Sequence, residues 1–208
     1  MWEVNMLLRR DCLLGGLSAG LVLALPVIVR ADTRSEPAGR LVAAARRQVG
    51  VTLTYDAAYS KLDYPGGDVP RERGVCTDVI VRAYRDALDI DLQVFVHEDM
   101  RKAFSAYPAL WGLKKTDRNI DHRRVPNLQA FFRRAGAAQA ISEAGADYRP
   151  GDIVSHMLPG NLPHIGIVAD ERTADGSRPF VVHNIGAGVR LEDVLFAYPI
   201  TGHYRYRV

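Results

Sequence analysis

The chain has 208 residues, of which 48% are hydrophobic and 25% are charged. This composition is typical of a folded globular protein and excludes a disordered or fibrous one. The formal net charge is only +3, which is too small to indicate a nucleic-acid-binding surface. We therefore expect no nucleic-acid partner.

The first segment has the organisation of a secretory signal peptide. Arg9 and Arg10 precede an apolar run from Leu13 to Val29, and Val29-Arg30-Ala31 places small residues before a polar break. We predict a signal peptide over residues 1–31 and a single mature domain over residues 32–208. The arginine pair also fits a twin-arginine export signal. The protein is then periplasmic or otherwise exported. The alternative is an uncleaved anchor, but glycines and a proline within the run argue against stable membrane insertion.

Cysteine usage points to a reactive thiol. The chain has two cysteines, and Cys12 lies within the predicted signal peptide. Cys76 is then the single cysteine of the mature protein, in an oxidising compartment where cysteines are usually paired. An unpaired thiol there indicates a reactive role. The alternative is a buried free cysteine that acts as a small hydrophobic residue.

Helical patterns fill the earlier part of the mature chain. Apolar spacing and capping residues predict helices at Pro37–Gln48, Val75–Leu88, His97–Tyr107 and Asn127–Ala135, and the glycines and prolines of residues 51–74 predict a structured loop. Cys76 stands in the first turn of its helix, on the stripe that faces the core. Because a helix N-terminus favours negative charge, we expect a lowered thiol pKa.

From Pro150 onward the pattern changes to short apolar runs separated by turn residues. It predicts strands at Gly151–Met157, His164–Ala169, Phe180–Asn184, Val189–Leu191 and Gly202–Arg207. Helices followed by hairpin-connected strands predict an α+β fold, with N-terminal helices packed on a C-terminal antiparallel sheet.

Two histidines are candidates for acid–base chemistry. His164 opens an otherwise apolar strand and is the best candidate for a base that activates Cys76. The next strand carries His183 and Asn184, whose side chains must point to opposite faces. Only one of them can orient His164, and we assign that role to His183.

Several motifs together resemble a known family. They are Gly67-Asp68-Val69-Pro70, Gly74-Val75-Cys76-Thr77-Asp78-Val79, Asn119-Ile120-Asp121-His122-Arg123-Arg124-Val125-Pro126-Asn127, Leu162-Pro163-His164 and Ile200-Thr201-Gly202-His203-Tyr204. They resemble the bacterial exported family catalogued as domain of unknown function 1287. The order of cysteine, histidine and a third polar residue also resembles the NlpC-type cell-wall endopeptidases of the papain-like superfamily.

The NlpC resemblance implies a papain-like fold, no cofactor, and a catalytic set of Cys76, His164 and His183 acting on peptidoglycan or another envelope amide. It also matches Tyr55 to a tyrosine near the cysteine, although a core aromatic residue fits equally well. Two departures put the substrate contacts in doubt. NlpC-type sequences usually have aspartate before the cysteine and serine-glycine after it, where this chain has Val75 and Thr77-Asp78.

Other polar residues are candidates for substrate binding. Arg71 and Arg73 precede Cys76, and Asp121-His122-Arg123-Arg124 is the densest polar cluster. Arginine grips a carboxylate through two parallel N–H bonds, so these residues could hold a stem-peptide carboxylate. Internal ion pairs in a solvated loop explain the same residues equally well. We also predict that Asn184 contacts the substrate.

Two other classes of function remain open. One is a metal-dependent hydrolase built from Cys76, His164, His183 and perhaps His122, although no closely spaced ligand pair supports it and we expect no metal. The other is a non-catalytic module that binds an envelope polymer.

Overall fold

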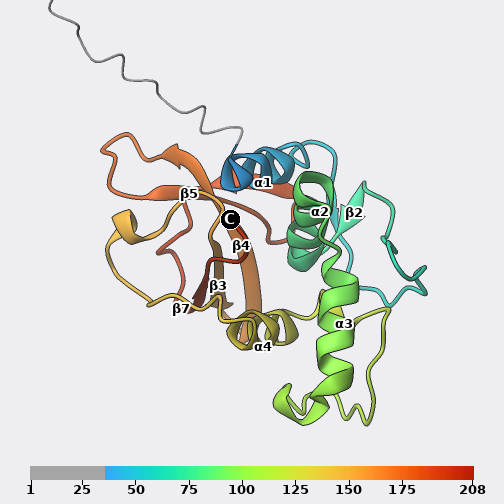
Figure 1. Ribbon diagram of the computed structural model, residues 1–208. Helices are drawn as coiled ribbons and strands as arrows, with labels where there is room; N and C mark the ends of the chain where they lie inside the picture. The colour runs from blue at the N-terminus through green and yellow to red at the C-terminus, as the bar shows by residue number, and fades with distance from the viewer. Residues whose placement is uncertain (1–35) are drawn as a thin grey trace, which may run out of the picture. The chain divides into compact units, whose positions relative to one another are not determined.

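Along the chain the helices come first and a five-stranded antiparallel sheet follows (Figure 1). The structure, a computed structural model, describes residues 36–208, so the predicted signal peptide and its cleavage position lie outside the described residues. The described residues all belong to one unit by their contacts. The α+β class and the antiparallel sheet expected from the sequence are confirmed.

Four α-helices are present in the described part of the chain: α1 (Pro37–Arg46), α2 (Cys76–Leu88), α3 (Leu92–Lys102) and α4 (Val125–Arg134). The start of α2 is fixed by its own residues. Val75 is extended, and its N–H donates to Asp78 Oδ2 at 2.8 Å, so the third helical residue satisfies a free donor at the helix start. Cys76 is therefore the first residue of α2.

The predicted helix at residues 97–107 was placed too far along the chain. The helix observed there is α3, which begins at Leu92 because Asp91 caps its N-terminus by accepting the Gln93 N–H at 3.0 Å. Ala103 leaves the helical conformation, and the 3₁₀ turn η1 (Phe104–Ala106) follows. α4 begins two residues before its predicted start, with Pro126 in its first turn.

The strands are β3 (Ile153–Leu158), β4 (Leu162–Arg172), β5 (Pro179–Asn184), β6 (Val189–Glu192) and β7 (Ile200–Tyr204). Their order across the sheet is β6-β5-β4-β3-β7, which places the longest strand, β4, at the centre. All five predicted strands are present, but β7 begins before Gly202 and ends at Tyr204 rather than Arg207.

The predicted loop over residues 51–74 contains a small sheet that the sequence did not indicate. β1 (Thr54–Tyr55) and β2 (Arg73–Gly74) pair in parallel. Because β2 ends just before Cys76, this pairing brings Tyr55 to the start of α2.

Helices α1, α2 and α4 pack against the sheet, whereas α3 packs on α2, α4 and the 3₁₀ turn η2 (Asp121–Arg123) (Figure 1). Alternation along β4 sends Ile165 and Ile167 into the helix-side core and Val168 into a smaller cluster with Val181 and Leu195. Among residues 36–208, no helix has the length and apolar character needed to cross a membrane.

Candidate functional site

Cys76 lies where the first turn of α2 meets the central strand. Its side chain is 3% exposed and belongs to the helix-side core. Three groups approach the sulfur and favour its thiolate: the backbone N–H of Ile165 on β4, the Tyr55 hydroxyl, and the backbone N–H of Thr77. The sulfur therefore contacts the strand at the residue that directly follows His164.

The thiol is nevertheless weakly acidic. Burial and, to a smaller extent, the Asp78 carboxylate outweigh the three donors and raise the pKa of Cys76 to about 11. The expectation that the helix N-terminus lowers this pKa is wrong for the unliganded protein. The reason is that the sulfur is almost completely desolvated, and burial penalises a charge more than a helix terminus rewards it.

His164 and His183 are hydrogen-bonded to each other. His164 Nε2 lies 2.9 Å from His183 Nδ1, and the two rings are inclined at 74°. Gly166 provides the room for this contact. A Cβ at position 166 would lie 2.5 Å from Val181 Cγ1 and 3.1 Å from the Cβ of His183, so a side chain there would force Val181 to shift and would crowd His183.

Glu192 completes a chain of three side chains and was missed by the sequence analysis. His183 Nε2 lies 3.0 Å from Glu192 Oε2. In the strand register Arg190 is opposite His183, so Glu192 is its diagonal neighbour on the same face. The alternation of apolar and charged residues in Val189-Arg190-Leu191-Glu192 indicates that Arg190 and Glu192 share one face of the strand. It does not indicate which residues of the neighbouring strand they lie beside.

These contacts determine which nitrogens carry protons. A carboxylate only accepts hydrogen bonds, so His183 Nε2 donates to Glu192. His183 Nδ1 is then the acceptor in the neutral ring, and His164 Nε2 must be the donor in the bond between the two histidines. His164 Nδ1 is left with a free lone pair, which is the form that a general base requires.

Both imidazoles are neutral over the physiological range. Burial, with smaller contributions from the neighbouring His183 and His156, lowers the pKa of His164 to about 3. Burial also lowers the pKa of His183, against the opposing influence of Glu192. His156 is also buried, its ring centroid lies 6.5 Å from that of His164, and its Nε2 is bonded to the Leu195 carbonyl at 2.9 Å.

Cys76 contacts the residue that follows His164, but the Cys76 thiol and the His164 imidazole are not bonded to each other. In the part of the chain that the structure describes, no hydrogen bond joins the thiol to the imidazole, and the sulfur contacts β4 through the backbone N–H of Ile165. Catalytic pairs in unliganded enzymes are commonly longer than a hydrogen bond and close when substrate binds.

Asn184 faces away from His164. Its side-chain N–H donates to the Gly74 carbonyl at 3.0 Å, and its Oδ1 accepts the Gly186 N–H at 3.2 Å. The first of these bonds joins β5 to β2, two residues before Cys76. The structure therefore places His183, not Asn184, against His164, and gives Asn184 a role in positioning the start of α2.

The predicted substrate-binding arginines are each paired within the protein. Arg71 holds Asp86 through two bonds of 2.7 Å, and Arg73 Nη1 lies 2.6 Å from Asp56 Oδ2. Arg123 is buried and grips Asp78 through two bonds of 2.9 Å. Its remaining N–H groups donate to the carbonyls of Asp56 and Ala58. These ion pairs match the structural alternative, and substrate binding by these arginines stays a prediction.

Asp121 and His122 are also buried. Asp121 Oδ2 accepts from His97 Nδ1 at 3.0 Å and from the Asp117 N–H at 2.8 Å. Burial lowers the pKa of His122 to about 4, and its Nδ1 has no hydrogen-bond partner. Among residues 36–208, no three or more histidine, cysteine, aspartate or glutamate side chains are grouped so as to hold a metal ion.

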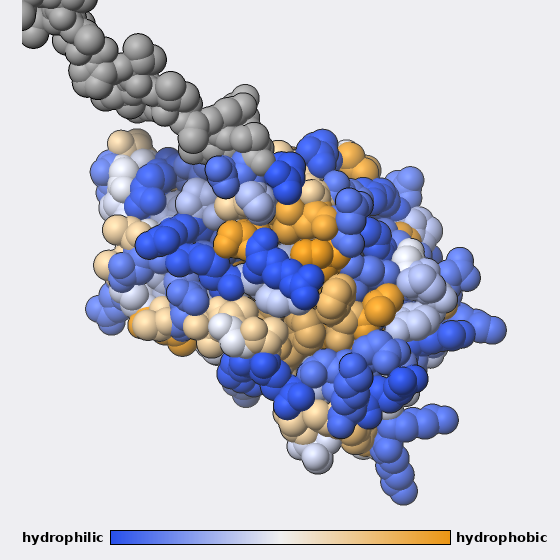
Figure 2. Space-filling model, viewed as in Figure 1, coloured by the Kyte–Doolittle hydropathy of each residue, from blue (hydrophilic) through white to orange (hydrophobic). Residues whose placement is uncertain are grey.

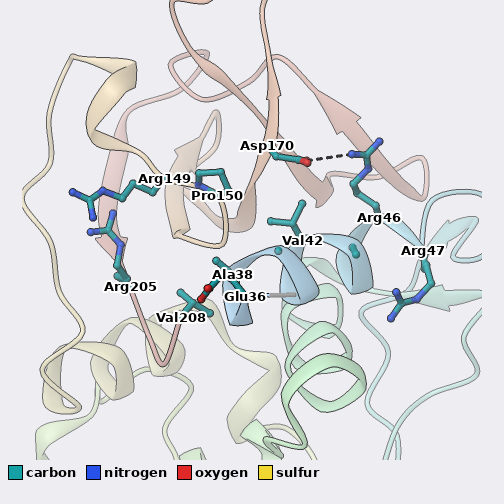
Figure 3. Close-up of a pocket in the computed structure, with 12 residues that line it drawn as sticks. Glu36, Ala38, Val42, Arg46, Arg47, Arg149, Pro150, Asp170, Arg205 and Val208 are labelled. Atoms are coloured by element: carbon teal, nitrogen blue, oxygen red, sulfur yellow. Dashed lines mark hydrogen bonds and ion pairs between the residues drawn. The ribbon is translucent and has the colours of Figure 1, made fainter. Parts of the chain in front are cut away.

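A pocket of about 860 Å³ lies on another part of the surface. Figure 2 shows an apolar area beside α1 with hydrophilic residues around it, and Figure 3 shows the pocket with Arg149 and Arg205 on one side and Arg46 and Arg47 on the other. None of the predicted site residues lines it. Arg46 is paired with Asp170, and Arg205 with the buried Asp152.

Comparison with known proteins agrees with the first of the two resemblances. The family model of the domain of unknown function DUF1287 matches residues 42–206. The chain is 56% identical over 164 residues to a protein of Escherichia coli strain K12 described as uncharacterized protein YijF, and the match covers 79% of each chain. Cys76, His164, His183 and Glu192 all lie within the matched range, and the chain belongs to the DUF1287 family.

Proposed function

We propose that this protein is an exported cysteine hydrolase that cleaves an amide bond in the peptide stems of the cell wall. The observation that carries the proposal is the chain Glu192–His183–His164, with bonds of 3.0 and 2.9 Å, which leaves an unprotonated imidazole nitrogen on the strand that Cys76 contacts. A buried base with a fixed tautomer beside a helix-opening cysteine is the arrangement used in thiol acyl transfer.

In this mechanism the thiol is ionised during the attack. As the Cys76 sulfur bonds to the carbonyl carbon, its proton passes to His164 Nδ1, and the carbonyl oxygen becomes an oxyanion. The Tyr55 hydroxyl and the Cys76 backbone N–H are donors for that oxyanion. His164 then returns the proton to the departing amine, and water hydrolyses the resulting thioester with the same base. The neutral thiol and imidazole favoured by burial suit this sequence better than a preformed ion pair.

The fold that we propose is the papain-like arrangement of the NlpC type. It is supported by a cysteine at the first residue of a helix packed on an antiparallel sheet, and by the order of Cys76, His164 and His183 along the chain. The cell-wall substrate and the periplasmic location rest on the resemblance to NlpC-type enzymes and on the signal-like first 31 residues.

The test is to incubate the protein with purified peptidoglycan and to search for newly formed amines and carboxylates by mass spectrometry. Wild type should release muropeptide fragments, and Cys76→Ala and His164→Ala should not. His97→Ala is the matched control, since His97 is bonded to Asp121 and not to this chain. If wild type and Cys76→Ala both bind peptidoglycan and neither releases fragments, the protein is a binding module and the hydrolase proposal is wrong.

A further inference from the structure

A second pocket lies at the C-terminal end of α3 and the segment that follows it, which runs past η1 towards α4 (Figure 1). Its volume is about 240 Å³, and its walls are mostly apolar: Met100, Phe104, Leu110, Trp111 and Leu113. Tyr107 also lines the pocket, and its hydroxyl donates to Asp99 Oδ2 at 2.7 Å. The one charged residue of this lining is Arg124.

Among residues 36–208, Arg124 forms no ion pair with a carboxylate, although Asp121 and Asp117 lie near enough to influence it. Its guanidinium lies 4.0 Å from the centroid of the Trp111 ring, and its Nη1 is buried without a hydrogen-bond partner. Burial lowers the pKa of Arg124, so its charge is only partly compensated by the surrounding groups. Neither of the nearby carboxylates forms an ion pair with Arg124: Asp121 accepts from His97 through Oδ2, while its Oδ1 is buried without a partner, and Asp117 accepts from Tyr59 and Asn119.

In the larger pocket, two of the four lining arginines, Arg46 and Arg205, are neutralised by Asp170 and Asp152. An unpaired guanidinium in an apolar pocket attracts an anion, since a buried N–H without a partner costs about 1–3 kcal/mol and more when it carries charge. The apolar walls add a second requirement, that the anion must have an apolar body.

We propose that this pocket binds a small organic carboxylate with an apolar body, held by Arg124 and stacked beside Trp111. At roughly 30 Å³ for each water-sized group, the pocket holds about eight non-hydrogen atoms. Arginine and carboxylate match in geometry through two parallel N–H bonds. Exposure of Leu110 at 47% and Trp111 at 51% leaves the ligand a way in from solvent. This site is independent of the hydrolase proposal.

The sequence provides a direct reporter of binding. The chain has two tryptophans, Trp2 and Trp111, so the full chain with Trp2→Phe has Trp111 as its only tryptophan. Titration with hexanoate, which is of the required size, should change the Trp111 fluorescence in a saturable way. Hexan-1-ol and hexylammonium test the need for negative charge, and acetate and inorganic phosphate test the need for the apolar body.

We expect Arg124→Gln to weaken hexanoate binding by roughly tenfold or more, as loss of a charge-assisted hydrogen bond requires. Arg118→Gln is the matched control, since Arg118 also lies over an aromatic ring, Tyr64, but does not line the pocket. Cys76→Ala should bind hexanoate as wild type does.

A measurement on the unaltered protein guards against a variant that fails to fold. Hexanoate, but not hexan-1-ol, should protect Arg124 from phenylglyoxal, as read by peptide mass spectrometry. The proposal is overturned if hexan-1-ol or phosphate binds as tightly as hexanoate. It is overturned equally if Arg124→Gln binds hexanoate as wild type does, or if wild type shows neither saturable binding nor protection.

Discussion

His183 Nε2 lies 3.0 Å from Glu192 Oε2 on the adjacent strand, and this contact makes His183 Nδ1 an acceptor for His164. Glu192 therefore acts on His164 through His183 as a positioning residue. Glu192→Ala should lower the rate of amide cleavage by roughly tenfold, the effect of losing one hydrogen bond to a charged group, with little change in KM.

A readout besides activity separates positioning from a general loss of structure. In wild type the ¹⁵N chemical shifts of His164 should report a proton on Nε2, and in Glu192→Ala a mixture of tautomers. Asp193→Asn is the control, because Asp193 pairs with Arg178 at the surface. An unchanged tautomer in Glu192→Ala would contradict the assignment.

His183 and Asn184 should differ in the kind of damage that their removal causes. His183→Ala should lower the cleavage rate and leave a measurable remainder, because the nucleophile and base survive. Asn184→Ala leaves the Gly74 carbonyl without its donor in a buried position, and should lower the free energy of unfolding by about 1–3 kcal/mol. Urea unfolding and initial rates measured on both variants distinguish these outcomes. The reverse pattern would reassign the orienting role to Asn184.

Tyr55 should control the acidity of the thiol. Its hydroxyl lies beside Cys76 and favours the thiolate, while burial and the neighbouring sulfur raise the pKa of Tyr55 itself. Tyr55→Phe should therefore raise the pKa of Cys76 above about 11 and slow its alkylation by iodoacetamide at a fixed pH below that value. Tyr59→Phe removes a hydroxyl that bonds Asp117 instead and should leave the alkylation rate unchanged. Equal rates in wild type and Tyr55→Phe would count against a contact between hydroxyl and sulfur.

The buried pair of Arg123 and Asp78 should matter mainly for stability. The two side chains are 3% and 5% exposed, and Asp78 also accepts the Val75 N–H at the start of α2. Asp78→Asn leaves the buried guanidinium without its counterion and should lower the free energy of unfolding by about 3–5 kcal/mol. Asp86→Asn, which breaks the exposed pair with Arg71, should cost at most about 1 kcal/mol. A similar small cost for both variants would show that Arg123 is free for another ligand.

Buried histidines should make the fold sensitive to acid. Burial lowers the pKa of His164 to about 3 and that of His122 to about 4, whereas both titrate near about 6.5 in an unfolded chain. Between about pH 6.5 and these lower values the unfolded chain binds more protons, so stability falls as the pH falls. Above about pH 6.5 these histidines do not make the free energy of unfolding depend on pH.

Each such histidine contributes a slope of up to about 1.4 kcal/mol per pH unit. Urea unfolding at about pH 7.5 and about pH 5 measures the difference, and His122→Gln should reduce it by the share of one histidine. An identical pH dependence in wild type and His122→Gln would mean that His122 titrates normally in the folded protein.

The sequence by itself determined the elements that depend on local physics. Apolar spacing identified α2 with Cys76 in its first turn, and alternation identified all five strands of the sheet together with the opposite directions of His183 and Asn184. These features follow from helical and strand periodicity and from residues that begin or end an element nearby in the chain. The misplaced α3 had a local signal too, since Asp91 is a capping residue.

Tertiary structure decided the features that depend on which distant residues meet. Glu192 reaches His183 only through the register of β5 and β6, and Tyr55 reaches Cys76 only through the short pairing of β1 with β2. The partners of Arg71, Arg73 and Arg123 likewise come from other segments. The pKa of Cys76 is raised, whereas the sequence predicted a lowered value. The reason is that this pKa depends on burial, and burial is a property of the packed sheet and helices rather than of the residues adjacent in sequence.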